Sequence, residues 1–303
     1  MIDLHLHTKL SIGENSPDEL IELANENNLE VFSITDNDHC LAYQGLDLNK
    51  YPNLVTGAIF TTSIEGLLVN IIAYEVNPSI INEFYYKRYS TENIEKQETR
   101  FFEQLLEIMK KNNVKLSENL KLTLVEKGIS KKLVFYDAQK NNPDFPFISY
   151  RDFYRNGLSN PFSSFYLDEA SIHPSLNKIL SLIKKAGGKA FLAHPYEYGI
   201  KVEGLIDKLV DEGIDGLEVF HPSAALRQSL KLLNICKKEN LLASGGSDYR
   251  KARYHIPIGV NIHSKLYEDD SFLWLNKYKK WSLKWVITFF NTSSFLQLSF
   301  QHL

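Results

Sequence analysis

Two histidines near the start of the chain most constrain what it can fold into. Residues 2–7 read IDLHLH, an apolar segment that predicts a short strand carrying His5 and His7. Side chains two positions apart on a strand point to the same face. A second apolar segment, VFSIT, runs directly into Asp36. In parallel β/α folds functional groups gather at strand ends, and imidazoles with carboxylates suit Zn, Mn or Fe. The stretch therefore predicts an α/β fold with a metal site at these strands.

The alternation of helices and strands returns in the second half of the chain, after Pro174. Three helix–strand pairs follow one another, and their strands read KAFLAHP, GLEVFHP and LASGGSDY. Each strand finishes in a polar residue that can bind a ligand, namely His194, His221 and Asp248. In a (β/α) barrel such strand ends converge at one mouth.

The segment between these two parts has a different character. Residues 80–113 are rich in Glu, Lys, Arg and aromatic residues and predict one long helix or two. We therefore expect residues 77–166 to form a helical insertion on a core made of 1–76 and 167–263. The C-terminal extension, 264–303, is expected to pack on the core as a final helix or strand, or to contact a membrane surface or a partner.

Composition excludes several classes of protein. The net charge of −3 gives no overall basic character, which argues against a protein that coats nucleic acid by charge. Cys40 and Cys236 are the only cysteines, and they fit no zinc spacing, which indicates a reducing compartment. The sequence shows no secretory signal and no run of about 18 apolar residues. It therefore predicts a cytoplasmic protein with no transmembrane segment.

The motifs DLHLHT, ITDND, AGGKAFLAHP, GLEVFHP and GGSDYR, in this order, resemble the PHP (polymerase and histidinol phosphatase) family. The resemblance is strongest to stand-alone phosphoesterases that act on small phosphorylated nucleotides or RNA ends. It implies a distorted (β/α)7-like barrel with a helical insertion, and a cluster of two or three divalent metals at its mouth. It also implies that His5, His7, His194 and Asp248 are metal ligands.

The chain departs from the family pattern at five positions. Ile12 and Ile59 stand where the family has an aspartate and a glutamate. Asn37, Asn70 and Arg250 stand where it has histidines. Isoleucine offers no ligand, asparagine offers only a neutral oxygen, and arginine repels a cation and attracts an anion. The expected cofactor is therefore one divalent Mn, Zn or Fe ion rather than a full cluster.

The remaining candidate residues surround this metal set. We expect His194 or His39 to assist proton transfer. Arg250 is a candidate phosphate contact, and so is Arg100 in the helical insertion, where a solvated helix charge is the alternative. For His221 a structural role is as consistent with the sequence as a place in the site. The predicted site-lining residues are Asp36, Asn37, Asn70 and His221.

Two functions are compatible with this pattern. The first is a metal-dependent phosphoesterase that hydrolyses a phosphate ester of a nucleotide or nucleic-acid end with a reduced or altered metal site. The alternative is a catalytically degenerate PHP module that binds a phosphorylated ligand or a partner protein. The retained H-x-H pair with Asp248 favours the enzyme, whereas the five replaced positions favour the binding module.

Overall fold

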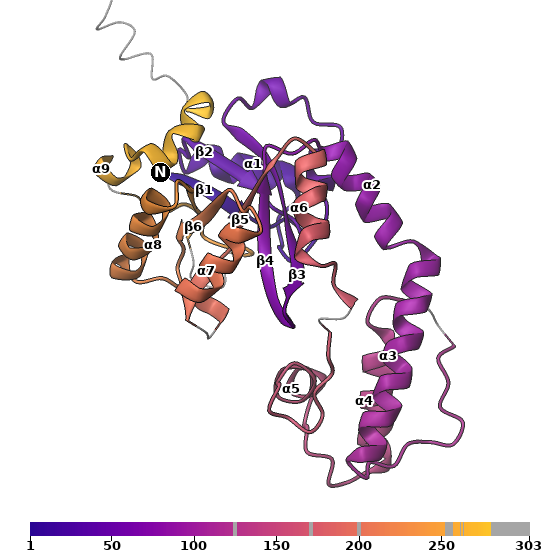
Figure 1. The fold of residues 1–303 in the computed structure, drawn as a ribbon. Helices are drawn as coiled ribbons and strands as arrows, with labels where there is room; N and C mark the ends of the chain where they lie inside the picture. The colour runs from indigo at the N-terminus through magenta and orange to yellow at the C-terminus, as the bar shows by residue number, and fades with distance from the viewer. Residues whose placement is uncertain are drawn as a thin grey trace, which may run out of the picture. The chain divides into compact units, whose positions relative to one another are not determined.

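The computed structural model describes residues 1–123, 126–169, 172–198, 201–251, 257–260, 262 and 264–279. Within these residues the chain is a mixed α/β fold (Figure 1). It has a seven-stranded sheet in which the strands follow one another in chain order. This confirms the predicted α/β class. None of the helices described is long and apolar enough to cross a membrane.

The sheet is parallel except at its centre. β1, β2 and β3 pair in parallel, and so do β5, β6 and β7, whereas β4 is antiparallel to β5. Beyond β7, Tyr249 forms a parallel bridge with Leu6, and the His7 amide donates to the Tyr249 carbonyl at 3.0 Å. This contact between β1 and the segment that follows β7 is compatible with the predicted distorted barrel. The strands are β1 (Ile2–Leu6), β2 (Val31–Ile34), β3 (Leu54–Ile64), β4 (Leu67–Tyr74), β5 (Lys189–Leu192), β6 (Gly216–Phe220) and β7 (Leu242–Gly245).

The chain divides into two compact units. Unit 1 comprises Met1–Phe60, Ile71–Pro78 and the described residues of Ala186–Leu303. Strands β1, β2 and β6 are buried along their whole length, as expected for parallel strands covered on both faces. Helix α8 packs against β6. The helices of this unit are α1 (Pro17–Glu26), α7 (Val202–Asp211), α8 (Leu226–Lys238) and α9 (Ser264–Tyr267).

Helix α1 begins with a capping box. Ser16 at the N-cap accepts a hydrogen bond from the Glu19 amide at 3.3 Å, and the Glu19 carboxylate accepts one from the Ser16 amide at 2.6 Å. This capping box, with Pro17 as the first helical residue, satisfies amides that would otherwise have no partner. The cap therefore fixes the end of the loop that leads from β1 into α1.

Unit 2 comprises Thr61–Asn70 and Ser79–Lys185. The stretch predicted as one or two helices forms two, α2 and α3. Helices α3 and α4 lie side by side (Figure 1) around a buried core that includes Phe101, Phe135 and Phe153. The helices are α2 (Pro78–Arg88), α3 (Thr91–Lys111), α4 (Ile129–Asn141), the short α5 (Tyr150–Asp152), which continues as a π-helical turn (Phe153–Leu158), and α6 (Leu176–Lys185).

The predicted domain boundaries stay predictions. The described part of the predicted C-terminal extension, residues 264–279, belongs to unit 1 and contacts β7. A 3₁₀ segment, Asp270–Tyr278, carries Trp274, whose indole nitrogen donates to the Ala243 carbonyl at 2.9 Å. Residues 280–303, and with them most of the predicted membrane or partner contact, lie outside the described residues.

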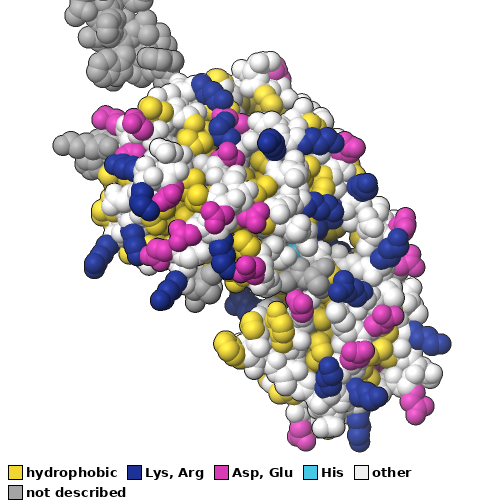
Figure 2. Space-filling model, viewed as in Figure 1, with side chains coloured by type: hydrophobic (Ala, Val, Ile, Leu, Met, Phe, Trp, Pro, Cys, Tyr) yellow, Lys and Arg dark blue, Asp and Glu magenta, His cyan; other side chains and the backbone are white. Residues whose placement is uncertain are grey.

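Charged side chains are mixed over the surface that Figure 2 shows. Acidic and basic groups alternate on this face, and among the described residues drawn there neither sign forms a continuous patch. The distribution agrees with the small net charge of −3, which gives no general attraction to nucleic acid.

Candidate metal centre

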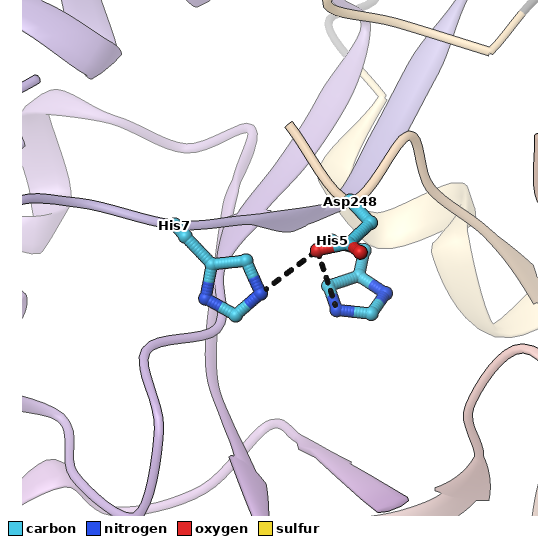
Figure 3. A group of neighbouring side chains, drawn as sticks. All are labelled: His5, His7 and Asp248. Carbon is cyan, nitrogen blue, oxygen red and sulfur yellow. Dashed lines mark ion pairs between the residues drawn. The ribbon is translucent and has the colours of Figure 1, made fainter. Parts of the chain in front are cut away.

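His5 lies on β1 and His7 directly follows that strand, and both imidazoles lie beside Asp248, which follows β7 (Figure 3). The Asp248 oxygen Oδ1 lies 3.2 Å from Nε2 of His7 and 3.8 Å from Nε2 of His5. One potential ligand atom of each residue lies within 4.8 Å of those of the other two, and both histidines are buried. Two imidazoles and a carboxylate at this spacing can bind a divalent transition metal.

A buried carboxylate on β1, Asp3, holds the loop that carries Asp248. It accepts hydrogen bonds from the amide and the hydroxyl of Ser247, at 2.9 and 2.5 Å, and from the Gly259 amide at 2.7 Å. Burial raises the pKa of Asp3 to about 6, although these hydrogen bonds oppose the rise. A Cβ atom at Gly246 would lie 2.3 Å from the Cβ of His5, so glycine is needed for the loop to approach β1 this closely.

Two of the predicted ligands have an unusual backbone conformation. The φ angle is +52° at Asp248 and +28° at His194, in the left-handed region that residues other than glycine rarely adopt. Such strain persists where the surrounding structure enforces it, and it clusters at functional sites. In both cases the strained residue follows a buried strand, so the chain turns sharply at the residue that carries the candidate ligand.

Glu218, in the middle of β6, is a site residue that sequence reasoning missed. Its side chain is fully buried, Oε1 lies 3.0 Å from Nδ1 of His5, and Oε2 accepts a hydrogen bond from the His194 amide at 2.7 Å. The signal in the sequence was a charged residue inside the apolar segment GLEVF, because a buried carboxylate needs partners. His5, Glu218 and His221 form a second group whose potential ligand atoms lie within 4.8 Å of one another.

His194 and His221 complete a cluster of imidazoles at the strand ends. Their ring centroids are 5.5 Å apart, and each lies 6.0 Å from the ring of His5. Glu197 reaches both, with oxygens 3.6 Å from Nδ1 of His194 and 3.8 Å from Nδ1 of His221. The His221 side chain is buried, yet among the described residues its Nε2 has no hydrogen-bond partner. The structure thus brings His194 and His221 to the predicted site, although within the described chain His194 joins neither three-residue group.

Burial and the neighbouring charges shift the pKa values of the ionisable groups in the site. Burial would raise the pKa of Asp248, but the hydrogen bond from His7 and the charge of His5 outweigh it and hold the pKa well below its usual range. Burial lowers the pKa of His7. Burial would also lower the pKa of His5, but the attraction of Glu218 outweighs it and raises that pKa. The Asp248 carboxylate is therefore ionised, and His7 favours the neutral form that binds a metal.

Arg250 is paired with Asp248. Its Nε donates to Oδ1 at 3.0 Å, and its Nη2 donates to Oδ2 at 2.6 Å. This two-point contact engages both oxygens of a predicted ligand, so the guanidinium and a metal would share one carboxylate. The Arg250 side chain is 44% exposed, so an anion in solution can reach it.

The loop after β1 involves two further predicted residues. Asp36 accepts hydrogen bonds from the amide and the hydroxyl of Thr8, at 2.8 and 2.6 Å. Nε2 of His39 lies 3.1 Å from the Leu10 carbonyl, and Nδ1 of His39 accepts a hydrogen bond from the Leu41 amide at 3.3 Å. Both side chains hold the local backbone. The predicted role of His39 in proton transfer would require one of its ring nitrogens to leave the backbone, and it stays a prediction.

The other predicted positions lie in both units. Asn37 forms a parallel bridge with Ile59, so two positions that depart from the family pattern are neighbours. Asn70 and Arg100 belong to unit 2, where Asn70 accepts a hydrogen bond from the Thr61 hydroxyl at 3.0 Å and Arg100 is exposed on α3. Their predicted roles in lining the site and binding phosphate stay predictions.

Comparisons with known proteins bear on the fold and the enzyme class. No family model matches the chain. A curated relative, the phosphoribosyl 1,2-cyclic phosphate 1,2-diphosphodiesterase of Eggerthella lenta, is 22% identical over 270 residues, which cover 86% of this chain and 98% of that protein. A candidate metal-dependent phosphoesterase of Bifidobacterium adolescentis aligns with a TM-score of 0.59 at 22% identity, over 93% of this chain and 97% of that one. The chain has the fold of the PHP-type phosphoesterases.

An amidohydrolase of Chromobacterium violaceum shares this PHP-type fold. It aligns with a TM-score of 0.60 at 19% identity, over 87% of this chain and 92% of that one, and its structure holds sulfate and no metal. The predicted resemblance is therefore confirmed in fold, and the hydrolase names of these relatives agree with the predicted enzyme class. The donor set fits a divalent ion in this fold, because it combines buried imidazoles with an ionised carboxylate.

Proposed function

We propose that this chain is a metal-dependent phosphoesterase that works with one divalent ion. The observation that carries the proposal is the group of His5, His7 and Asp248, whose potential ligand atoms lie within 4.8 Å of one another. Mn, Zn or Fe bound there would polarise a phosphoryl oxygen and lower the pKa of a bound water. The retained ligands favour this reading over a full cluster, because five family ligand positions carry other residues.

The chain's own residues provide binding and orientation for the substrate. Arg250 carries a positive charge next to Asp248 and can donate to the oxygens of a phosphate group. Burial lowers the pKa of His194, which favours a neutral ring that can accept a proton. In the proposed site Arg250 binds the substrate phosphate and His194 moves a proton.

A small phosphorylated nucleotide, or the end of a nucleic acid, is the proposed substrate class. The E. lenta relative is named for a phosphoribosyl cyclic phosphate, which joins a sugar to phosphate as a nucleotide does. The net charge of −3 favours a small substrate over a long polyanion. Cys40 and Cys236 are buried and form no disulfide, which suits the cytoplasm, and we propose the cytoplasm as the location.

A second candidate function is a binding module that has lost catalysis. The observation that favours it is the two-point pair between Arg250 and Asp248, because a guanidinium already neutralises one predicted metal ligand. In that case the same arginine would bind a phosphorylated ligand without hydrolysis. The two candidates differ in their dependence on metal.

Metal content separates them. The chain is purified without chelator and analysed by elemental mass spectrometry beside a His5→Ala/His7→Ala double variant, and both are assayed with nucleoside monophosphates and cyclic phosphates. The phosphoesterase predicts about one Mn, Zn or Fe per chain, lost in the variant together with hydrolysis. A chain that holds no metal after soaking with Mn and Zn, yet binds phosphate through Arg250, would instead establish the binding module.

A further inference from the structure

We propose that Glu218 is a positioning residue that keeps the proton of the His5 ring on Nδ1, so that Nε2 is free to bind a divalent cation. The inference deepens the proposed function and rests on its metal site. It assigns a role to a residue on β6, a strand that contributes none of the residues of the group His5, His7 and Asp248.

The contact between Glu218 and His5 decides where the ring carries its proton. Oε1 of Glu218 lies 3.0 Å from Nδ1 of His5, and an ionised carboxylate can only accept hydrogen bonds. Nδ1 must therefore be the protonated nitrogen. A neutral imidazole carries a single proton, so the lone pair available to a metal is on Nε2. That nitrogen lies 3.8 Å from Asp248 and thus belongs to the candidate cation position.

The second oxygen of Glu218 prevents the carboxylate from turning away. Oε2 accepts a hydrogen bond from the His194 amide at 2.7 Å, at a residue whose φ angle is +28°. Both carboxylate oxygens are thus engaged within the protein, and Glu218 is completely buried. These contacts favour an orienting role for Glu218 over a role as a direct ligand, because a metal on Oε1 would displace His5.

His221 has the opposite arrangement and provides an internal reference. The Ser223 amide donates to Nδ1 of His221 at 3.2 Å, so Nδ1 is an acceptor and the proton lies on Nε2. Two buried histidines whose rings are 6.0 Å apart are therefore expected to have different tautomers. The different groups that face Nδ1 in the two rings account for this expectation.

The substitution Glu218→Gln tests the inference with little change in shape. The His194 amide can be satisfied only by the new amide oxygen, so the amide nitrogen must face His5 and donate to its Nδ1. We expect the His5 proton to move to Nε2, and the affinity for Zn or Mn to fall about 10- to 100-fold. The tautomer is read from ring nitrogen shifts of the metal-free, histidine-labelled protein at a pH where the rings are neutral, with His5 assigned from a His5→Ala variant. Affinity is measured by calorimetry.

The matched control is Glu98→Gln, which changes a buried glutamate of unit 2 in the same way. It should leave the His5 tautomer and the metal affinity unchanged, and His221 should keep its proton on Nε2 in every variant. A His5 ring protonated on Nε2 in the wild-type chain would overturn the inference, even if Glu218→Gln does not fold. So would a loss of affinity in Glu218→Gln without a change of tautomer. Failure of the wild-type chain to bind metal would refute the proposed function, and the tautomer measurement does not depend on that result.

Discussion

Each unit buries a glutamate, and the two glutamates have different partners. Glu98 on α3 accepts hydrogen bonds from the Gly128 amide at 2.6 Å and from the Ser130 amide at 3.0 Å, at the start of α4. It therefore satisfies amides that the helix leaves without partners. Glu218 instead contacts an imidazole, His5, that belongs to the candidate metal centre. The comparison teaches that burial of a charge marks a need for partners, and that only the nature of those partners separates a structural role from a functional one.

The cores of the two units also differ in the kind of residue that they bury. Unit 2 has an aromatic core, in which Phe153 lies 5.6 Å from Phe135 and 5.2 Å from Phe147 between ring centroids. The core of unit 1 is polar where the strands end, with buried histidines and carboxylates. We therefore expect changes in unit 2 to alter stability and changes at the strand ends of unit 1 to alter binding.

Phe153→Ala should give the largest effect. The side chain is fully buried, so its removal leaves a cavity and should lower the free energy of unfolding of unit 2 by about 3–5 kcal/mol. Hydrogen exchange of α3 and α4 measures the change. Metal affinity, measured on the folded protein, should stay the same. A loss of metal binding by a variant that stays fully folded would contradict the expectation that changes in unit 2 alter stability and leave metal binding intact.

His7→Ala should give the next largest effect, and it falls on binding. Removal of one of three potential ligands should weaken metal affinity by about 100-fold or more, which corresponds to about 2.8 kcal/mol. His39→Gln is the matched histidine control, because both ring nitrogens of His39 face the backbone. It should lower the thermal midpoint and leave the metal affinity unchanged. Equal losses of affinity in both variants would show that the loop, rather than the ligand, controls binding.

Glu98→Gln sharpens the comparison of the two glutamates. In the glutamine variant an NH2 group replaces one carboxylate oxygen of Glu98, and this group cannot accept the hydrogen bond of the backbone amide that it faces. We therefore expect a loss of about 1–3 kcal/mol in the stability of unit 2. Urea unfolding followed by far-ultraviolet circular dichroism measures it. An unchanged stability would mean that Glu98 is not the cap that its contacts indicate.

Arg250→Ala should have the smallest effect, and its sign is informative. The guanidinium competes with a cation for Asp248, so its removal should raise metal affinity by up to about fivefold, the upper range for a partly exposed pair. The affinity for phosphate should fall. Arg227→Ala, on the exposed surface of α8, is the control. A lower metal affinity in Arg250→Ala would show that the arginine holds Asp248 in place for the metal rather than competing with it.

Local pattern was enough to predict much of the fold. The strand that carries His5 and the three strands that precede His194, His221 and Asp248 follow from short-range signals. What the sequence could not give is the pairing between distant side chains. The pair between Arg250 and Asp248 and the hydrogen bonds of Asp3 with Ser247 depend on how a loop folds back onto β1. The hydrogen bond between His39 and the Leu10 carbonyl likewise joins segments 29 residues apart.

The sequence by itself determined that His5 and His7 share a face, because side chains alternate along a strand whatever surrounds it. Only the tertiary structure decided which ring nitrogen of His5 faces the candidate cation. That choice depends on Glu218, which is 213 positions away along the chain and reaches His5 through the packing of β6. A hydrogen bond between distant segments produces no periodic pattern in the sequence. The only local sign of this one is Glu218 itself, a charged residue within an apolar strand.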